Sequence, residues 1–427
     1  MTGNAGSATA DNAVEWSIGK EYQVTRWVQL ILSVICMISI SSIQYVWTLF
    51  AKPFSEALGA GMPAIQTTFA ILIVLQTIAA PIGGNLMDRF GPRGMIATGT
   101  FLTGLSWILA SYATSLPMLY LTYGVIGGIG SGAVIVGTTG QMVTWFPDRR
   151  GFSVGMIAAA FGMGAILTTF PISMTIASQG YQTALIQFGA IFAIVGVASA
   201  LGLKRAPKFA MVGQSKSTSA AADKTSGEML KTPVFWLMFV MLAMMCMTGL
   251  MVISQLATFA TDFGLGKATL WGFAVIPLAL TIDRFTNGLT RPFFGWVSDN
   301  IGRENTMFLA FSLEGIAILV WLLTRENPLL FVLLSGVVFF GWGEIFSLFP
   351  ATATDTFGTR NAAQNWGLLM CAEGVGSILG GPLASLLHQS TGSWEVVFGV
   401  AIVADLLTAF LAIAVLKPMR RRYLAKN

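Results

Sequence analysis

The sequence predicts an all-α membrane protein with twelve transmembrane helices in two pseudo-symmetric halves of six. The first observation is composition, since 55% of the 427 residues are hydrophobic and only 10% are charged, unlike a soluble domain. The second is a series of twelve apolar stretches, each at least the roughly 20 residues that cross a bilayer. The third is an internal repeat that relates the first six stretches to the last six.

The predicted spans divide into two bundles at the longest polar segment. That segment, 204–232, reads "GQSKSTSAAADKTSGE" in its middle and is typical of a flexible linker. It separates a first bundle, 27–203, from a second, 233–416, and polar tails flank them at 1–26 and 417–427. The spans are predicted at 27–50, 63–86, 94–113, 116–141, 151–177, 181–203, 233–260, 268–297, 304–324, 328–350, 361–388 and 393–416.

The repeat keeps one register without a gap at an offset of 211 residues. Chance does not keep one register over some seventy residues, and duplicated halves with a site between them are typical of secondary transporters. The matched pairs are Pro81/Pro292, Gly84/Gly295, Asp88/Asp299, Gly91/Gly302, Gly104/Gly315, Pro117/Pro328, Gly130/Gly341, Gly132/Gly343, Phe146/Phe357 and Arg149/Arg360.

The distribution of Lys and Arg predicts the orientation, because positive residues are retained on the cytoplasmic side. We expect both termini and the linker to be cytoplasmic, in a cell membrane such as a bacterial inner membrane. The opposite side carries only Lys52, Lys267 and Arg325. The cytoplasmic side collects Arg89, Arg93, Arg149, Arg150, Lys204, Arg205, Lys208, Lys216, Lys224, Lys231, Arg303, Arg360, Lys417, Arg420, Arg421, Arg422 and Lys426.

Three loops carry a family resemblance. "GGNLMDRFGPRG", "FGWVSDNIGREN" and "WFPDRRG" resemble the cytoplasmic loop signatures of the major facilitator superfamily, and the resemblance covers essentially the whole chain. It implies the major facilitator fold. In that family these loops lock and release the inner gate, so the resemblance implies a gating role for Asp88, Arg89, Arg93, Arg149, Asp299 and Arg303.

Four charges inside the predicted spans break the repeat. A requirement of the scaffold would recur in both halves, so this asymmetry points to cargo or to coupling. An arginine at the bilayer centre costs at least about 2.5–3.5 kcal/mol and needs a partner or water. The charged residues and their counterparts are Arg284/Ile73, Arg291/Ala80, Glu344/Ala133 and Glu373/Gly162.

Helical spacing predicts that the two arginines share a face. Arg284 and Arg291 are seven residues apart, which places them about 10 Å apart along the axis. Asn287 precedes Arg291 by four residues and lies beside it. Pro292 removes a backbone donor and leaves a carbonyl available.

Depth within the spans suggests ion pairs for these arginines. Arg291 and Glu373 fall at one level, and Arg284 and Glu344 at a deeper one, while Asp283 could serve either arginine. The alternative is that both arginines are structural and are satisfied by acids that fix helix packing.

A guanidinium in a low-dielectric cavity can donate two parallel hydrogen bonds to a carboxylate, so we expect a small organic anion as cargo. Aromatic walls with a few amide and hydroxyl donors suit a small, flat carboxylate, although any one aromatic could be packing alone. The candidate lining residues are Gln44, Tyr45, Trp47, Gln66, Trp342 and Phe346.

Five segments in order resemble the oxalate/formate antiporters and the related monocarboxylate transporters. They are "IQYVWTLFAKPF", "WFPDRRGFSVG", "GEMLKTPVFW", "NGLTRPFFGWVSDNIGR" and "GWGEIFSLFP". The resemblance implies that Arg291 binds the substrate carboxylate and that Gln44, Tyr45, Gln66 and Trp342 line the pocket. Where that family has a lysine in the eleventh span this chain has Glu373, and Phe161, Phe346, Ile135 and Met370 replace pocket tyrosines and a tryptophan.

Glu373 suggests proton coupling. A carboxylate bound at Arg291 would repel an ionised Glu373 and favour its taking up a proton, which gives anion and proton symport. Glu344 and Asp283 are further candidates for this role. An exchanger remains the alternative, if Glu373 stays ionised and only tunes the charge of the site.

Rival classes find little support in the sequence. A carrier of neutral or cationic compounds is the first alternative. A membrane enzyme or receptor is the second, but there is no HExxH metal motif, no phosphate-binding GxxxxGK[ST] and no sizeable extramembrane domain. We expect no metal, no cofactor and no nucleic-acid partner, and a monomer.

Overall fold

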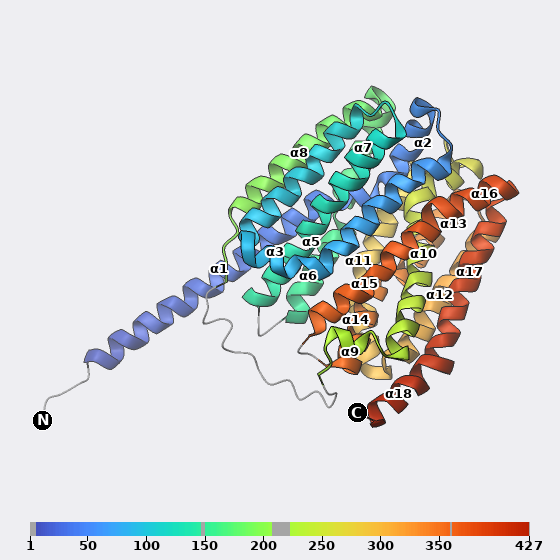
Figure 1. Ribbon diagram of the computed structural model, residues 1–427. Coiled ribbons are helices and arrows are strands. Elements are labelled where there is room, and N and C mark those ends of the chain that lie inside the picture. The colour runs from blue at the N-terminus through green and yellow to red at the C-terminus, as the bar shows by residue number, and fades with distance from the viewer. Residues whose placement is uncertain (1–5, 147–149, 207–222, 359–360, 427) are drawn as a thin grey trace, which may run out of the picture.

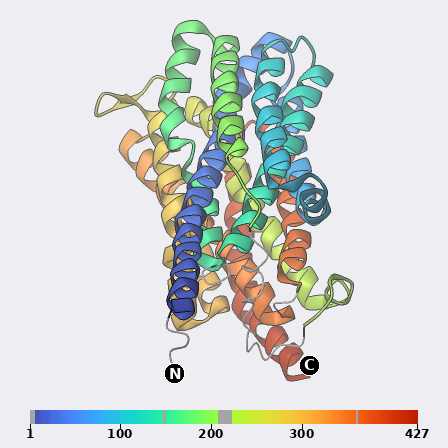
Figure 2. The same cartoon turned by 90° about the vertical axis from the view of Figure 1, so that its left-hand side faces the viewer.

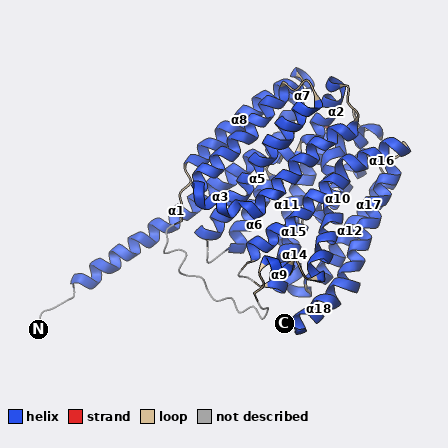
Figure 3. Cartoon of the chain, in the orientation of Figure 1, coloured by secondary structure: helices blue, strands red, loops and turns tan. Residues whose placement is uncertain are grey.

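The computed structural model describes the backbone of residues 6–146, 150–206, 223–358 and 361–426, and their side chains except 6–21, 80, 82–90, 150–151, 363 and 426. Within these ranges the chain is almost entirely helical (Figure 3). The helices run roughly parallel to one long axis (Figure 2). The start of the first helix and the last helix lie at the same end of the molecule, here called the terminal face, and the other end is the opposite face (Figure 1).

The first bundle contains the predicted spans one to six. Several spans consist of two or three consecutive helices, and the second and third spans form one long helix bent at Gly91. The elements are α1 (Gly6–Tyr45), α2 (Trp47–Leu58), α3 (Met62–Ser111), α4 (Leu116–Leu119), the π-helix η1 (Tyr120–Ile126), α5 (Gly127–Trp145), α6 (Arg150–Met163), α7 (Ile166–Gln179) and α8 (Tyr181–Leu201).

The second bundle lies beside the first and contains spans seven to twelve (Figure 1). The short helix α9 precedes it, and a two-stranded hairpin precedes its second long helix. The elements are α9 (Ser226–Met229), α10 (Pro233–Asp262), β1 (Thr269–Leu270), β2 (Phe273–Ala274), α11 (Val275–Ile301), α12 (Arg303–Leu323), α13 (Pro328–Trp342), α14 (Ile345–Phe357), α15 (Ala362–Ile378), η3 (Leu379–Leu383), α16 (Ala384–Thr391), α17 (Trp394–Leu411), η4 (Ala412–Leu416) and α18 (Lys417–Lys426).

Composition alone does not identify helix α11 as a membrane span. Eleven helical segments of the described part are long and apolar enough to cross a bilayer, and α11 is not among them because of its charges. Its 27 residues nevertheless reach about 40 Å, which exceeds the hydrocarbon core. The span begins at Val275 rather than at 268 as predicted, because the hairpin with Trp271 and Gly272 at positive φ occupies residues 269–274.

The repeat has a conformational cause at Gly91 and Gly302. Both glycines have positive φ, 70° and 89°, at the terminal-face bend between two spans of their own bundle. A side chain at such a φ is strained, so both halves need glycine at this bend. Other repeated glycines allow close packing instead, as at Gly130, where a Cβ would lie 2.8 Å from the backbone nitrogen of Thr103.

Three of the long helical spans of the described part contain a break. The first breaks at Val46, the fifth at Gly164–Ala165 and the tenth at Gly343–Glu344. A break leaves backbone carbonyls outside the helical ladder, where they are available to side chains or cargo. Ser41 uses one such group, since its Oγ donates to the carbonyl of Phe161 at 2.6 Å. These breaks surround the segment of α11 that carries the arginines.

Candidate functional site

Helix α11 turns one polar face toward the interface between the two bundles. Arg284, Asn287 and Arg291 are buried there, at the i, i+3 and i+7 spacings of one helical face, whereas the buried Asp283 interacts with Ser335 of α13 within the second bundle. The face crosses α6 closely, because Gly288 of α11 packs against the Met163 side chain. The charged segment of the second bundle therefore lies against the interrupted fifth span of the first.

Arg291 joins the two bundles directly. Its Nη1 donates to the backbone carbonyl of Ala158 in α6 at 2.5 Å, and its Nη2 donates weakly to Asn287 Oδ1 at 3.4 Å. Its guanidinium lies over the Phe346 ring, 4.9 Å from the centroid. The backbone of α6 passes close to the group at Gly162, where an added Cβ would make an ordinary contact with Nη2 at 3.4 Å.

The expected ion pairs are absent from this conformation. Within the described ranges, no carboxylate lies within the 4.0 Å of an ion pair from the guanidinium of Arg291 or Arg284. Glu373 and Glu344 act on Arg291 through longer-range electrostatic interaction. Depth along the spans correctly brings Glu373 near Arg291, but it assigned Glu344 to Arg284, whereas Glu344 interacts with Arg291. Depth carries no information about azimuth, and neither predicted ion pair forms.

Arg284 lies in an aromatic sandwich rather than in a polar pocket. Its guanidinium is 4.1 Å from the ring centroid of Tyr45, in the first bundle, and 4.4 Å from that of Phe339, in the second. All three of its guanidinium nitrogens are buried without an acceptor in the described structure. Tyr45 also packs against Phe161, with ring centroids 5.2 Å apart, and interacts with Arg291.

The charged side chains differ in how far they are sealed. Arg291 and Glu373 are 8% and 4% exposed, whereas Asp283, Arg284 and Glu344 are 0% exposed. Gln44 is also buried and interacts with Glu373. Arg291 and Glu373 are therefore the charged groups of the cluster that are least sealed from a solute.

Two predicted lining residues lie away from this cluster. Gln66 donates to the carbonyl of Ser254 and accepts from Trp47 Nε1, both at 2.9 Å, so its amide is engaged between the bundles. Trp342 is fully buried behind Phe346 and donates to the carbonyl of Met245 at 2.9 Å. The sequence alone could not distinguish Gln66 and Trp342 from the residues that contact Arg291.

Two of the residues predicted to gate, Asp299 and Arg303, lie in a charge network on the terminal face of the second bundle. Arg303 pairs with Asp299 at 2.7 Å and with Asp355 at 3.1 Å. Arg420 of the C-terminal helix joins it, with Glu304 at 2.7 Å and Asp355 at 3.8 Å. The sequence did not predict that Asp355, Glu304 and Arg420 belong to this network. The C-terminal tail and the loops are distant in sequence and come together only in the folded protein.

The corresponding network of the first bundle is described only in part. Arg93 donates to the carbonyl of Leu203 at 3.1 Å, which ties the bend at Gly91 to the end of α8. The side chains of Asp88 and Arg89, and all of Arg149, lie outside the described residues.

Two further buried acids and one sequence motif lie outside the predicted site. Glu314 and Asp405 are fully buried with Glu344 in the second bundle, and Thr248 Oγ1 donates to Asp405 at 2.8 Å. Residues 151–155 read "GFSVG", which matches the GxSxG of serine hydrolases. Ser153 lies inside α6 with no preceding strand, so it does not form a nucleophile elbow.

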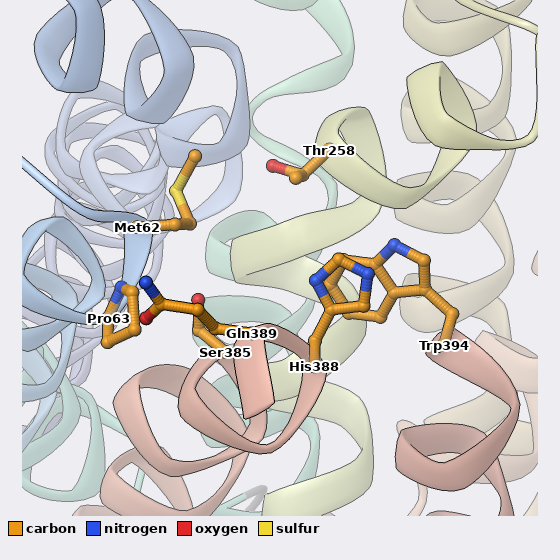
Figure 4. Close-up of a pocket in the computed structure, with 7 residues that line it drawn as sticks. All are labelled: Met62, Pro63, Thr258, Ser385, His388, Gln389 and Trp394. Carbon is orange, nitrogen blue, oxygen red and sulfur yellow. The ribbon is translucent and has the colours of Figure 1, made fainter. Parts of the chain in front are cut away.

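A cavity of about 250 Å³ lies between the bundles at the opposite face (Figure 4). The His388 ring stacks on Trp394 with centroids 4.0 Å apart, and Trp394 Nε1 donates to Asp262 at 2.8 Å. This cavity lies away from Arg291. Its lining residues are Met62, Pro63, Thr258, Ser385, His388, Gln389 and Trp394.

Comparison with known proteins identifies the family. A family model described as Major Facilitator Superfamily matches residues 30–285 and again residues 271–426. The chain belongs to the major facilitator superfamily. Two solved structures share the fold at 15% identity: a peptide transporter POT in complex with sulfate (TM-score 0.69, covering 93% of this chain and 94% of that one) and a nucleoside transporter NupG mutant (TM-score 0.71, 91% and 99%).

Curated relatives place the chain more narrowly within the superfamily. It is 31% identical to the oxalate:formate antiporter of Oxalobacter formigenes over 399 residues, 93% of each chain. It is 29% identical to the uncharacterized transporter YhjX of Escherichia coli (84% and 87% covered) and 25% identical to monocarboxylate transporter 13 of Bos taurus (79% and 78%). The chain is thus a multi-pass membrane transporter related to these proteins and not an enzyme.

Proposed function

We propose that the protein is a secondary active transporter that moves small organic carboxylate anions by alternating access, with Arg291 as the carboxylate ligand. One observation carries the proposal: Arg291 lies at the interface of the bundles without a counter-ion in the described structure. Its partners are a backbone carbonyl and an amide, and its Nε is buried without an acceptor. A buried guanidinium with unused donors favours an anionic ligand.

The geometry of Arg291 suggests how binding could drive movement. Ala158 belongs to the first bundle and Arg291 to the second, so their hydrogen bond links the two. A carboxylate that accepts from Nε and an Nη group at once competes with the Ala158 carbonyl for the same guanidinium. Binding would then replace a fixed link between bundles with a link through the cargo, and the bundles could rock about it.

Glu373 and Gln44 complete the proposed site. Gln44 lies beside Glu373, and its amide can donate to the second carboxylate or carbonyl oxygen of a small acid. Glu373 lies near enough to interact with Arg291 but is not paired to it. A second negative charge at Arg291 raises the electrostatic cost of an ionised Glu373, so we propose that cargo and a proton enter together.

Exchange without proton coupling is the second candidate. The relative in Oxalobacter formigenes is named an oxalate:formate antiporter, and Glu373 forms no ion pair with Arg291 that cargo would have to break. Asp283 and Glu344 are sealed, so Glu373 is the acid whose substitution separates the two candidates.

We also propose that the terminal face is cytoplasmic. The basic residues Lys417, Arg420, Arg421 and Arg422 lie on the last helix at that face, as the positive-inside rule requires. A bacterial inner membrane and a monomer fit this arrangement.

The test of cargo is uptake of labelled formate, acetate, lactate and oxalate into proteoliposomes. Wild-type protein should carry at least one of them, and Arg291→Ala should abolish that uptake. Arg325→Ala is the matched control, because Arg325 pairs with Glu395 at the opposite face, away from the cluster. Undiminished uptake by Arg291→Ala would reject the proposal and favour a carrier of neutral or cationic solutes.

The test of coupling uses the same vesicles with and without an inward proton gradient. Symport predicts that the gradient accelerates uptake and that Glu373→Gln removes the acceleration. Wild-type uptake that ignores the gradient but depends on a carboxylate trapped inside would establish exchange instead.

A further inference from the structure

We propose that Arg284 is a second carboxylate-binding site, closed in this conformation and opened only when the opposite face opens. It would receive the anion before Arg291 does. The inference rests on the proposed function and adds a second binding position to the transport path.

The depth of Arg284 places it on the path to the opposite face. It lies nine residues from the start of α11 at Val275, and Arg291 lies sixteen residues from it. Helical rise puts Arg284 about 10 Å closer to the opposite face than Arg291 and nearly in line with it. The cavity of about 250 Å³ lies between the bundles on that same face.

The packing of Arg284 is incomplete in a specific way. Two aromatic rings, one from each bundle, lie against the guanidinium, but a cation–π contact does not satisfy its N–H donors. The N–H donors point out at its edge, and no described residue accepts from them. Asp283 does not supply the missing partner, because adjacent helical residues point about 100° apart and no ion pair forms. A carboxylate is the group that fits such an edge.

The cover over Arg284 comes from the other bundle. Tyr45 ends α1 in the first bundle, and three residues later Thr48 Oγ1 accepts from the backbone nitrogen of Ala257 in α10 at 2.8 Å. This bond must break when the bundles part at the opposite face. The Tyr45 ring then leaves with the first bundle, whereas Phe339 stays with Arg284. Opening thus removes one aromatic face and exposes the guanidinium from one side of the membrane.

The first test is transport from each side. Initial uptake is measured in right-side-out and inverted vesicles from the same expressing cells, with whichever of labelled formate, lactate and oxalate the wild type carries fastest. Arg284→Gln should raise KM roughly tenfold or more from the opposite-face side, because a charged hydrogen bond is lost, and leave KM unchanged from the terminal-face side. Arg284→Lys, which keeps the charge, should recover part of the loss.

Two controls separate this inference from the proposed function. Arg325→Gln removes an arginine at the same face, paired with Glu395, and should change neither KM. Arg291→Ala should abolish uptake from both sides, which tests the proposed function alone. Equal changes from both sides for Arg284→Gln, or none from either, would overturn the second site while leaving the role of Arg291 intact.

The second test needs no transport assay and covers the case in which Arg284 variants do not fold. Wild-type vesicles of each orientation are treated with the membrane-impermeant reagent 4-sulfophenylglyoxal, and the adduct on Arg284 is quantified by mass spectrometry. The adduct should form only from the opposite-face side and should decrease when oxalate or lactate is present. Modification from the terminal-face side, or none from either side, would refute the inference.

Discussion

In the proposed function, Arg291 combines two roles that a lysine could not fill together. Its planar guanidinium donates from Nη1 to the Ala158 carbonyl across the bundle interface, and its Nε remains free to donate to a ligand. A lysine ammonium is a point charge that cannot offer two parallel donors to one carboxylate. The flat guanidinium also lies over the Phe346 ring.

Arg291→Lys should therefore weaken carboxylate binding without abolishing it. The charge remains, so carboxylates should still bind, but the loss of one charged hydrogen bond should weaken binding by about 10- to 100-fold. Competition of unlabelled carboxylate against labelled uptake measures this change. Affinity equal to that of the wild type would mean that the bidentate geometry has no part in recognition.

At the scale of elements, the interrupted tenth span holds the site in shape. Gly343 lies at the break between α13 and α14, where a Cβ would lie 2.9 Å from the backbone carbonyl oxygen of Asn287. Glycine here lets α13 approach α11 closely enough for Thr290 Oγ1 to donate to the carbonyl of Phe340 at 2.5 Å. The break thereby fixes the helical turn that carries Asn287 and Arg291.

Gly343→Ala should destabilise the protein by about 1–3 kcal/mol, because the added methyl group forces the helices apart. Thermal unfolding in detergent measures the loss. Gly399→Ala is the matched control: that glycine is in α17, a Cβ added there would meet no atom within 4 Å, and the change should be neutral or slightly stabilising. A similar melting temperature for both variants would contradict this role of the break.

At the scale of the molecule, hydrogen bonds between the bundles hold the opposite face closed. Gln66 donates to Ser254, Ala257 donates to Thr48, and Ser377 donates to Ala70 at 3.5 Å. All three bonds lie between Arg291 and the opposite face. Alternating access requires that this set break as a group when the opposite face opens.

Gln66→Ala should shift the protein toward the form open at the opposite face. One hydrogen bond between bundles contributes about 1 kcal/mol, so the open population should rise roughly fivefold. Hydrogen exchange should become faster in α2 and at the end of α10 near Asp262. Gln187→Ala, at an exposed position on α8, is the control, and equal exchange in both variants would show that Gln66 does not hold the face closed.

Sequence patterns predicted the architecture well because hydrophobicity and repetition are properties of whole spans. The two loop motifs could also be recognised in the sequence, because each bend requires a glycine with positive φ, Gly91 in the first half and Gly302 in the second. The partners of the charged residues could not be predicted in the same way. Arg284 meets Tyr45 and Phe339 rather than Glu344, because side-chain azimuth is set by how separate spans pack.

The most direct measurement of the central claim is ligand binding to purified protein. Thermal shift with formate, lactate and oxalate, paired with the neutral amides formamide, lactamide and oxamide, isolates the carboxylate at nearly constant shape. We predict that at least one acid raises the melting temperature of the wild type, that its amide does not, and that Arg291→Ala removes the effect. An acid that stabilises Arg291→Ala as much as the wild type would contradict the claim.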